Sequence, residues 1–160
     1  MNDEARNGYD AAVKFVDKEA RTIWSVFTAL LAVNAFLLSF AAFLVTYLKP
    51  SIALARGVGG LGLFVCVVWA LMMMRNFDFY RYYFSWARKF EKDAFGDVVQ
   101  MVRKGKDFAR GDTVDIDGTE IRLRCGSKLF RAEWLIYVVI AAFAVVYAYM
   151  LFCGLPLPRP

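Results

Sequence analysis

The sequence predicts an all-α membrane protein with three transmembrane helices, a cytoplasmic helical stalk and a small β-hairpin, assembled as a homo-oligomer. Hydrophobic residues make up 59% of the 160 residues, and the mean hydropathy is +0.43. Soluble domains contain roughly 45–50% apolar residues. The excess lies in three blocks without Asp, Glu, Lys or Arg, at residues 23–48, 57–74 and 134–152. As a helix, each block is long enough to cross a hydrocarbon core of about 30 Å.

Residues 1–22 are polar but patterned. Their apolar positions recur at spacings of four and three, which predicts an amphipathic helix that leads directly into the first span. Two placements remain open for this cytoplasmic helix. It can lie on the membrane surface, or it can pack against the stalk.

The first span, residues 23–48, carries a stripe of small and weakly polar side chains. The stripe consists of Ser25, Thr28, Ala32, Ala35, Ser39 and Thr46. Small residues mark close helix packing in a bilayer, and they can also line a narrow water path. Packing is the favoured interpretation. Asn34 points away from the stripe, and we expect its amide to form a hydrogen bond to another helix.

The second span, residues 57–74, continues as a cytoplasmic stalk. Pro50 should end the first span, and residues 51–56 should form a short turn. The opening GVGGLG matches the spacing of a dinucleotide-binding loop, but that loop follows a strand in water, so close packing of glycine faces explains it better. In the stalk, Phe79, Tyr83, Trp86, Phe90 and Ala94 share one helical face.

The remainder of the cytoplasmic segment, residues 75–133, should hold a short helix and a hairpin. Valines 98, 99 and 102 suggest the helix, with its end at residues 103–106. Residues 113–125 alternate apolar and polar side chains around Asp117-Gly118, which predicts a β-hairpin with a two-residue turn. The third span covers residues 134–155. It carries a second small-residue stripe at Tyr137, Ala141, Ala144 and Ala148.

The distribution of basic residues predicts the orientation. Of the 20 lysines and arginines, 17 lie before the first span or within residues 75–133. Because cytoplasmic segments are rich in Lys and Arg, we expect the N-terminus and residues 75–133 in the cytoplasm and the C-terminus outside.

Enzyme chemistry is poorly supported. The chain has no histidine, which is the commonest general base and metal ligand, and its cysteines form no cluster. We therefore expect no catalytic residue, no metal and no cofactor.

The cytoplasmic segment is strongly basic and is flanked by aromatic residues. Contact with anionic lipid headgroups accounts for most of this charge. A pocket for a phosphorylated ligand is the alternative, because arginine pairs with phosphates and aromatic rings stack on bases. The candidate ligand-binding residues are Arg75, Arg81, Arg88, Arg122 and Arg124.

Residues 69–91, WALMMMRNFDFYRYYFSWARKFE, resemble a pattern of small bacterial inner-membrane proteins, the RipA-like oligomeric family. The segment is also similar to membrane-spanning effectors of anti-phage systems of the Hailong type, which nucleotide signals switch on. The residues that carry the resemblance are Trp69, Arg75, Tyr83, Ala87, Arg88 and Glu91. It implies a homo-oligomer of the bacterial inner membrane with a cytoplasmic vestibule.

Two functions follow from these features. The first is an oligomeric ion-channel effector of anti-phage defence, opened by a nucleotide or oligonucleotide signal and acting through abortive infection. The candidate pore or packing residues are Ser25, Thr28, Asn34, Ser39 and Thr46. The second is a non-conducting membrane scaffold or envelope-stress protein. In both cases the expected partners are other copies of the chain and membrane lipids, without stable binding of duplex nucleic acid.

Overall fold

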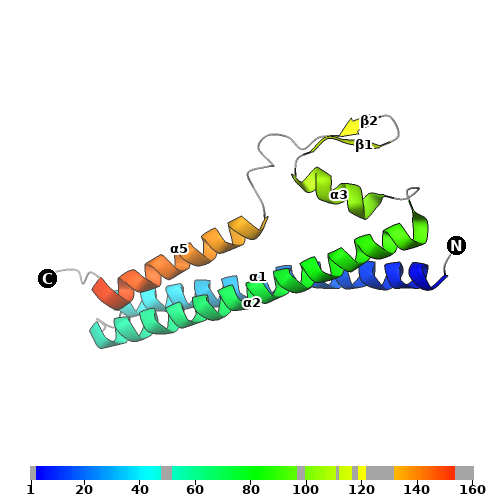
Figure 1. Ribbon diagram of the computed structural model, residues 1–160. Coiled ribbons are helices and arrows are strands. Elements are labelled where there is room, and N and C mark those ends of the chain that lie inside the picture. The colour runs from blue at the N-terminus through cyan, green and yellow to red at the C-terminus, as the bar shows by residue number, and fades with distance from the viewer. Residues whose placement is uncertain are drawn as a thin grey trace. The chain divides into compact units, whose positions relative to one another are not determined.

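A computed structural model describes residues 3–47, 52–96, 100–110, 112–116, 119–121 and 132–153. Four helices and two strands follow one another along these residues (Figure 1). They are α1 (Asp3–Tyr47), α2 (Ile52–Phe95), α3 (Met101–Arg110), β1 (Val114–Ile116), β2 (Thr119–Ile121) and α5 (Ala132–Cys153). Three of the helices, α1, α2 and α5, contain segments long and apolar enough to cross a membrane. The predicted fold, three long apolar helices with a small β-hairpin, is confirmed.

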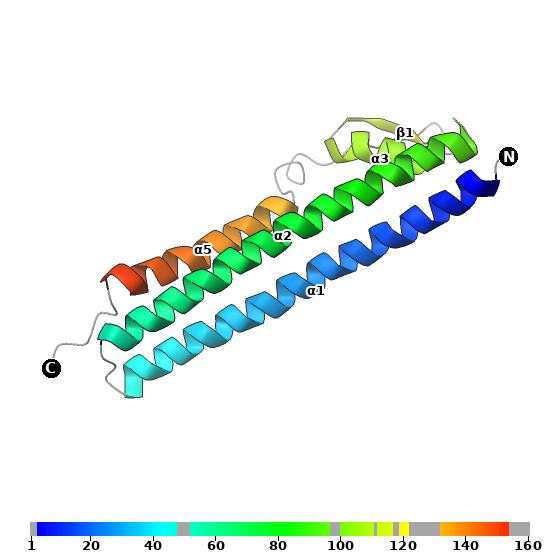
Figure 2. The ribbon, with the colours of Figure 1, turned by 60° about the horizontal axis from the view of Figure 1, so that its bottom comes forward.

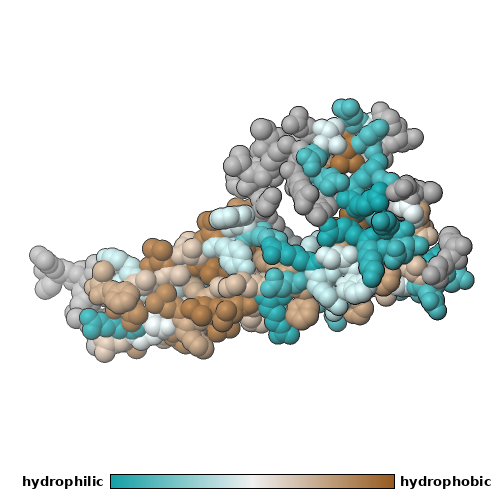
Figure 3. Space-filling model, viewed as in Figure 1, coloured by the Kyte–Doolittle hydropathy of each residue, from teal (hydrophilic) through white to brown (hydrophobic). Residues whose placement is uncertain are grey.

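The chain divides into two compact units. The first, here called the stalk unit, contains Met1–Ile23 and Asn76–Ala132. The second, the membrane unit, contains Trp24–Arg75 and Glu133–Pro160. Helices α1 and α2 contribute to both units and lie side by side in two views (Figures 1 and 2). On the face drawn in Figure 3, apolar surface covers the membrane unit, and hydrophilic atoms gather over α3 and the strands.

Helix α1 is continuous from Asp3 to Tyr47, because no proline or paired glycine interrupts it. Asp3 and Glu4 lie in its first turn, where negative charge complements the helix dipole. The amphipathic segment packs on the stalk half of α2. Phe15 stacks on Tyr83 with ring centroids 4.9 Å apart, and Gly8 lies against the ring of Phe90. Of the two placements left open, this is packing against the stalk.

Helix α2 begins earlier than expected. The predicted turn at residues 51–56 is wrong from Ile52 onward, because Ile52-Ala-Leu-Ala contains good helix formers and no breaker. The helix ends at Gly96, whose φ of 60° is the left-handed conformation that glycine adopts without strain. The N–H of Gly96 donates to the carbonyl oxygen of Lys92 at 3.0 Å and closes the last turn.

The helix predicted around residues 98–102 lies further along the chain. Helix α3 runs through residues 103–106, which were expected to end it, and continues to Arg110. The single glycine at position 105 does not stop this helix, because its neighbours are good helix formers and Glu91 of α2 binds the N–H groups of its first turn.

Strands β1 and β2 form the expected antiparallel hairpin. Val114 pairs with Ile121 and Ile116 with Thr119, so two residues separate the last pair. The predicted continuation of the hairpin at residues 122–125 lies outside the described residues, as do the turn residues Asp117 and Gly118.

Candidate functional site

A small polar cluster joins the three helices of the membrane unit. The thiol of Cys66 on α2 donates to Oδ1 of Asn34 at 3.7 Å, and the hydroxyl of Tyr147 on α5 donates to the backbone carbonyl of Asn34 at 3.1 Å. Asn34 and Tyr147 have no exposed surface, and Cys66 is 3% exposed. The Asn34 amide also donates to the carbonyl of Leu30 at 2.8 Å. Because lipid cannot satisfy such groups, the cluster fixes the three helices against one another.

Two glycines of GVGGLG, Gly59 and Gly62, lie where α2 meets α5. A Cβ at Gly59 would lie 2.8 Å from the backbone nitrogen of Leu151, and a Cβ at Gly62 would overlap the ring of Tyr147. The two positions are three residues apart and therefore share one face of α2. They allow α2 and α5 to approach closely, as the interpretation of GVGGLG as a packing face expects.

Trp69 is the largest fully buried residue. Its ring lies 5.5 Å from that of Phe27 and 6.2 Å from that of Phe143, so it contacts both other helices of the unit. Its burial among three helices makes Trp69 a core residue of the membrane unit.

The small-residue stripe of α1 is exposed in the single chain. Ser25, Thr28, Ser39 and Thr46 all lie on the surface, as do Ala32 and Ala35. Three of the hydroxyls bond to their own helix: Thr28 to the carbonyl of Trp24, Ser39 to that of Ala35 and Thr46 to that of Ala42, at 2.8–2.9 Å. The donors are satisfied, and the hydroxyl oxygens can still accept. The stripe of α5 is half-buried at Tyr137, Ala144 and Ala148 and exposed at Ala141.

In the stalk unit, a buried carboxylate holds the start of α3. Glu91 on α2 is 1% exposed. Its Oε1 accepts the N–H of Val102 at 2.8 Å, and its Oε2 accepts that of Arg103 at 2.9 Å. These are two of the orphan donors at a helix N-terminus, where negative charge is also favoured. Lys104 then donates to the carbonyl of Asp115 at 2.8 Å, which ties α3 to β1.

The candidate ligand-binding arginines do not all lie in one compact unit. Arg81 and Arg88 lie seven residues apart on one side of α2 in the stalk unit, whereas Arg75 belongs to the membrane unit. Arg88 is half-buried; its Nη2 donates to the hydroxyl of Ser85 at 3.1 Å, and its guanidinium lies 5.3 Å from the centre of the Phe84 ring. Arg122 and Arg124 lie outside the described residues.

Sequence reasoning missed the buried line of the stalk. The deepest residues there are Phe77, Ala87 and Glu91, about a quarter of a turn from the predicted aromatic face. Phe79, on that predicted face, is 41% exposed. The available signal for the burial of Glu91 was its position, where the helical spacing of the buried face calls for an apolar residue.

The surroundings of Glu91 influence Tyr9. Burial raises the pKa of the Tyr9 phenol, and the negative charges of Glu91 and Asp10 raise it further. Within the described ranges, no three residues of the metal-ligating kinds gather closely enough to hold an ion.

The protein-family comparison matches residues 7–155 to the model of the Octameric membrane protein family (8xMP). The chain belongs to this family. Comparisons with curated proteins and with solved structures gave no significant match. Membership in 8xMP supports the expected oligomer and indicates eight copies. The exposed faces of this 8xMP chain must therefore be divided between lipid, water and neighbouring copies.

Proposed function

We propose that the protein is an octameric ion channel of the bacterial inner membrane, with the small-residue stripe of α1 bordering the lumen. The observation that carries this proposal is the exposure of that stripe in a chain whose family is octameric. By helical geometry the stripe lies about 120° around α1 from buried Asn34, so it faces away from the chain's own helix contacts. The bulkier exposed side chains Phe36 and Phe40 lie about a quarter of a turn around α1 from the centre of the stripe and suit lipid.

The number of subunits constrains the type of channel. Helices pack with axes 8–10 Å apart, so a ring of eight touching helices encloses a lumen about 15 Å wide. Ions keep their hydration shell in such a lumen, because no group reaches across it to replace the water. The proposed channel therefore has a large conductance and weak selectivity among small ions.

The proposed opening signal is a nucleotide or oligonucleotide, and the proposed role is an effector of anti-phage defence. The resemblance of residues 69–91 to nucleotide-switched effectors motivates both. Arg88 with Ser85 and Phe84, and Lys89 above the ring of Trp86 at 4.7 Å, supply cations beside aromatic faces. A ligand shifts an equilibrium only by binding the two states differently, and charge-assisted contacts of about 1.5–3 kcal/mol each, repeated in eight subunits, provide such a difference.

The second candidate is a non-conducting octameric scaffold. The internal hydrogen bonds of Thr28, Ser39 and Thr46 favour it, because satisfied hydroxyls are tolerated against lipid or protein. A lumen filled with lipid would give this outcome.

The test is the current across planar bilayers that contain purified octamer, with and without short oligonucleotides. The proposal expects a weakly selective current that a nucleotide signal increases. It also expects that Arg88→Ala or Arg124→Ala weakens the response, whereas Arg6→Ala, at an exposed arginine of α1, leaves it unchanged. The absence of current under every ligand would leave the scaffold. A ligand-dependent current that survives both substitutions would retain the channel and exclude these arginines.

A further inference from the structure

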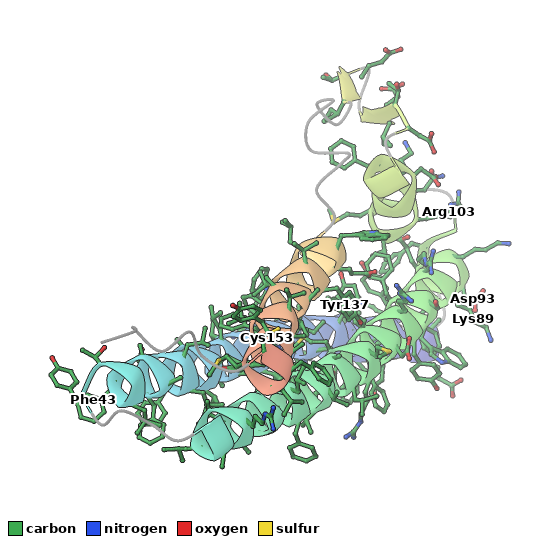
Figure 4. All side chains as sticks on the ribbon, turned by 90° about the vertical axis from the view of Figure 1, so that its left-hand side faces the viewer. Phe43, Lys89, Asp93, Arg103, Tyr137 and Cys153 are labelled. Carbon is green, nitrogen blue, oxygen red and sulfur yellow. The ribbon has the colours of Figure 1, made fainter. Side chains whose placement is uncertain are left out.

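The stalk half of α2 exposes a row of aromatic and charged side chains. Phe79 and Tyr82 are 41% and 55% exposed, and Trp86, Lys89 and Asp93 continue the row at spacings of four, three and four. Lys89 and Asp93 project from the same side of α2 in Figure 4. Contiguous exposed aromatic residues mark a contact surface, and alternating spacings of three and four match the seam between two helices.

A second exposed row lies on α1 of the same unit. It has the spacing four, three, four, three, four and is almost entirely charged. Its members are Asp3, Asn7, Asp10, Lys14, Asp17 and Arg21, all exposed. Asp17 and Arg21 form an ion pair at 2.8 Å within the helix, as Asp78 and Arg81 do on α2 at 3.9 Å.

A second copy of the chain is the partner that these rows fit. Eight copies inserted in one direction can be related by rotation about the membrane normal but not by a two-fold axis in the membrane plane. In such a ring each subunit presents two different faces to its neighbours. One of them can be the α1 row and the other the α2 row.

The contacts within one chain give the register between neighbours. Position 8 of α1 lies level with position 90 of α2, and position 15 with position 83. Rotation about the membrane normal does not change these levels, so helices close to the normal keep the same antiparallel register between subunits. Two exposed pairs of opposite charge then meet to within one residue: Asp10 with Lys89, and Arg21 with Asp78, which lies beside the α2 row.

We propose that the α2 row of one subunit binds the α1 row of the next as an antiparallel helix pair, repeated eight times around the ring. An anionic membrane surface fits the α2 row less well, because Asp93 lies within it and Asp78 beside it. The charged pairs set the register, although isolated exposed ion pairs contribute little to stability. The α1 row lies in line with the small-residue stripe along one side of the continuous helix α1, so this contact and a lumen beside the stripe are alternatives. Trapping of the pair described below would favour a packed stripe over a lumen.

Disulfide trapping of the full chain in membranes tests the register. In a background of Cys125→Ser and Cys153→Ser, the variant Asp10→Cys/Lys89→Cys should form a ladder of oxidised species up to the octamer. The matched control Asp17→Cys/Lys89→Cys uses the same faces but is displaced by about 10 Å along the helix, and it should remain monomeric. A control ladder as strong as that of the test pair, or oxidation that stops at the dimer, would overturn the proposal.

Charge exchange provides a second readout that does not need oxidation. Lys89→Glu should reduce the octamer fraction several-fold in native mass spectrometry, and Asp10→Lys/Lys89→Glu should restore it. A double variant no better than the single one would contradict the pairing. An undiminished octamer in Lys89→Glu would show that the row contacts something other than a second copy.

Discussion

In the membrane unit, helices α2 and α5 approach each other almost to backbone contact at two glycines, Gly59 and Gly62. At Gly62 the ring of Tyr147 occupies the space that a side chain would need. At Gly59 the obstacle is the backbone of α5 itself, which cannot rotate away. A Cβ at Gly57, in the same GVGGLG run, would meet no atom of another helix within 4 Å.

Gly59→Ala should therefore destabilise the membrane unit by about 1–3 kcal/mol, the usual cost of overpacking. Gly57→Ala, the matched control, should stabilise the helix slightly, because alanine has the higher helix propensity. Thermal unfolding in detergent compares the two. Equal midpoints for both variants would show that α2 and α5 do not meet at Gly59.

In the stalk unit, the carboxylate of Glu91 is the side chain on which local packing depends. It is almost fully buried, and two backbone donors of α3 satisfy it. Glu91→Ala should reduce the local stability of α3 by about 2 kcal/mol or more, because two charge-assisted hydrogen bonds are lost. Glu91→Gln should cost less, because the amide oxygen still accepts one bond.

Hydrogen exchange of the α3 amides measures this effect. Exchange should accelerate by about 30-fold or more in Glu91→Ala. It should not change in Asp93→Ala, which removes an exposed carboxylate two residues away. Unchanged protection of Val102 and Arg103 in Glu91→Ala would mean that Glu91 does not hold the helix.

At the scale of the element, α1 divides its exposed membrane surface by side-chain size. The stripe through Ala35 and Ser39 consists of small side chains, whereas Phe36 is 69% and Phe40 42% exposed about a quarter of a turn away. Lipid tolerates bulky apolar groups anywhere, but closely packed helices need small ones. The stripe is therefore the side of α1 suited to a neighbouring subunit or a lumen.

Ala35→Leu should weaken the octamer, because α1 helices that border a common lumen also touch one another and the larger side chain separates them. Ala29→Leu makes the same change at an exposed alanine on the bulky side of α1, so the octamer should persist. Native mass spectrometry in mild detergent gives the octamer fraction of each variant. Identical fractions would show that the stripe lies outside every subunit contact.

The sequence predicts the helices of this molecule better than it predicts their contacts. Charge-free blocks and the turn Asp117-Gly118 were sufficient for the three apolar helices and the hairpin, because both depend on local composition. The burial of Glu91 and Trp69 depends on which helix lies opposite, and periodicity along one helix does not contain that information. The missed start of α2 at Ile52 has a local origin, since Pro50 prevents helix upstream of itself but not downstream and Ile52-Ala-Leu-Ala favours helix.

At the scale of the whole molecule, the 8xMP family supplies the number of copies that a single chain cannot reveal. In a ring of eight copies, the small-residue stripe on α1 is a candidate lining of a lumen. The two exposed rows of the stalk unit are candidate contacts between neighbouring subunits. The proposed channel requires that ions pass through a lumen lined by the stripe.

Chemical modification of a cysteine placed in the stripe, during a bilayer recording, shows whether the stripe lines the lumen. With Cys125 and Cys153 replaced by serine, Ser39→Cys should lose most of its current when a charged methanethiosulfonate reagent is added. Phe36→Cys, on the bulky side of α1, should keep its current under the same treatment. Current through Ser39→Cys octamers that the reagent leaves unchanged, or equal block of both variants, would contradict a lumen lined by this face of α1.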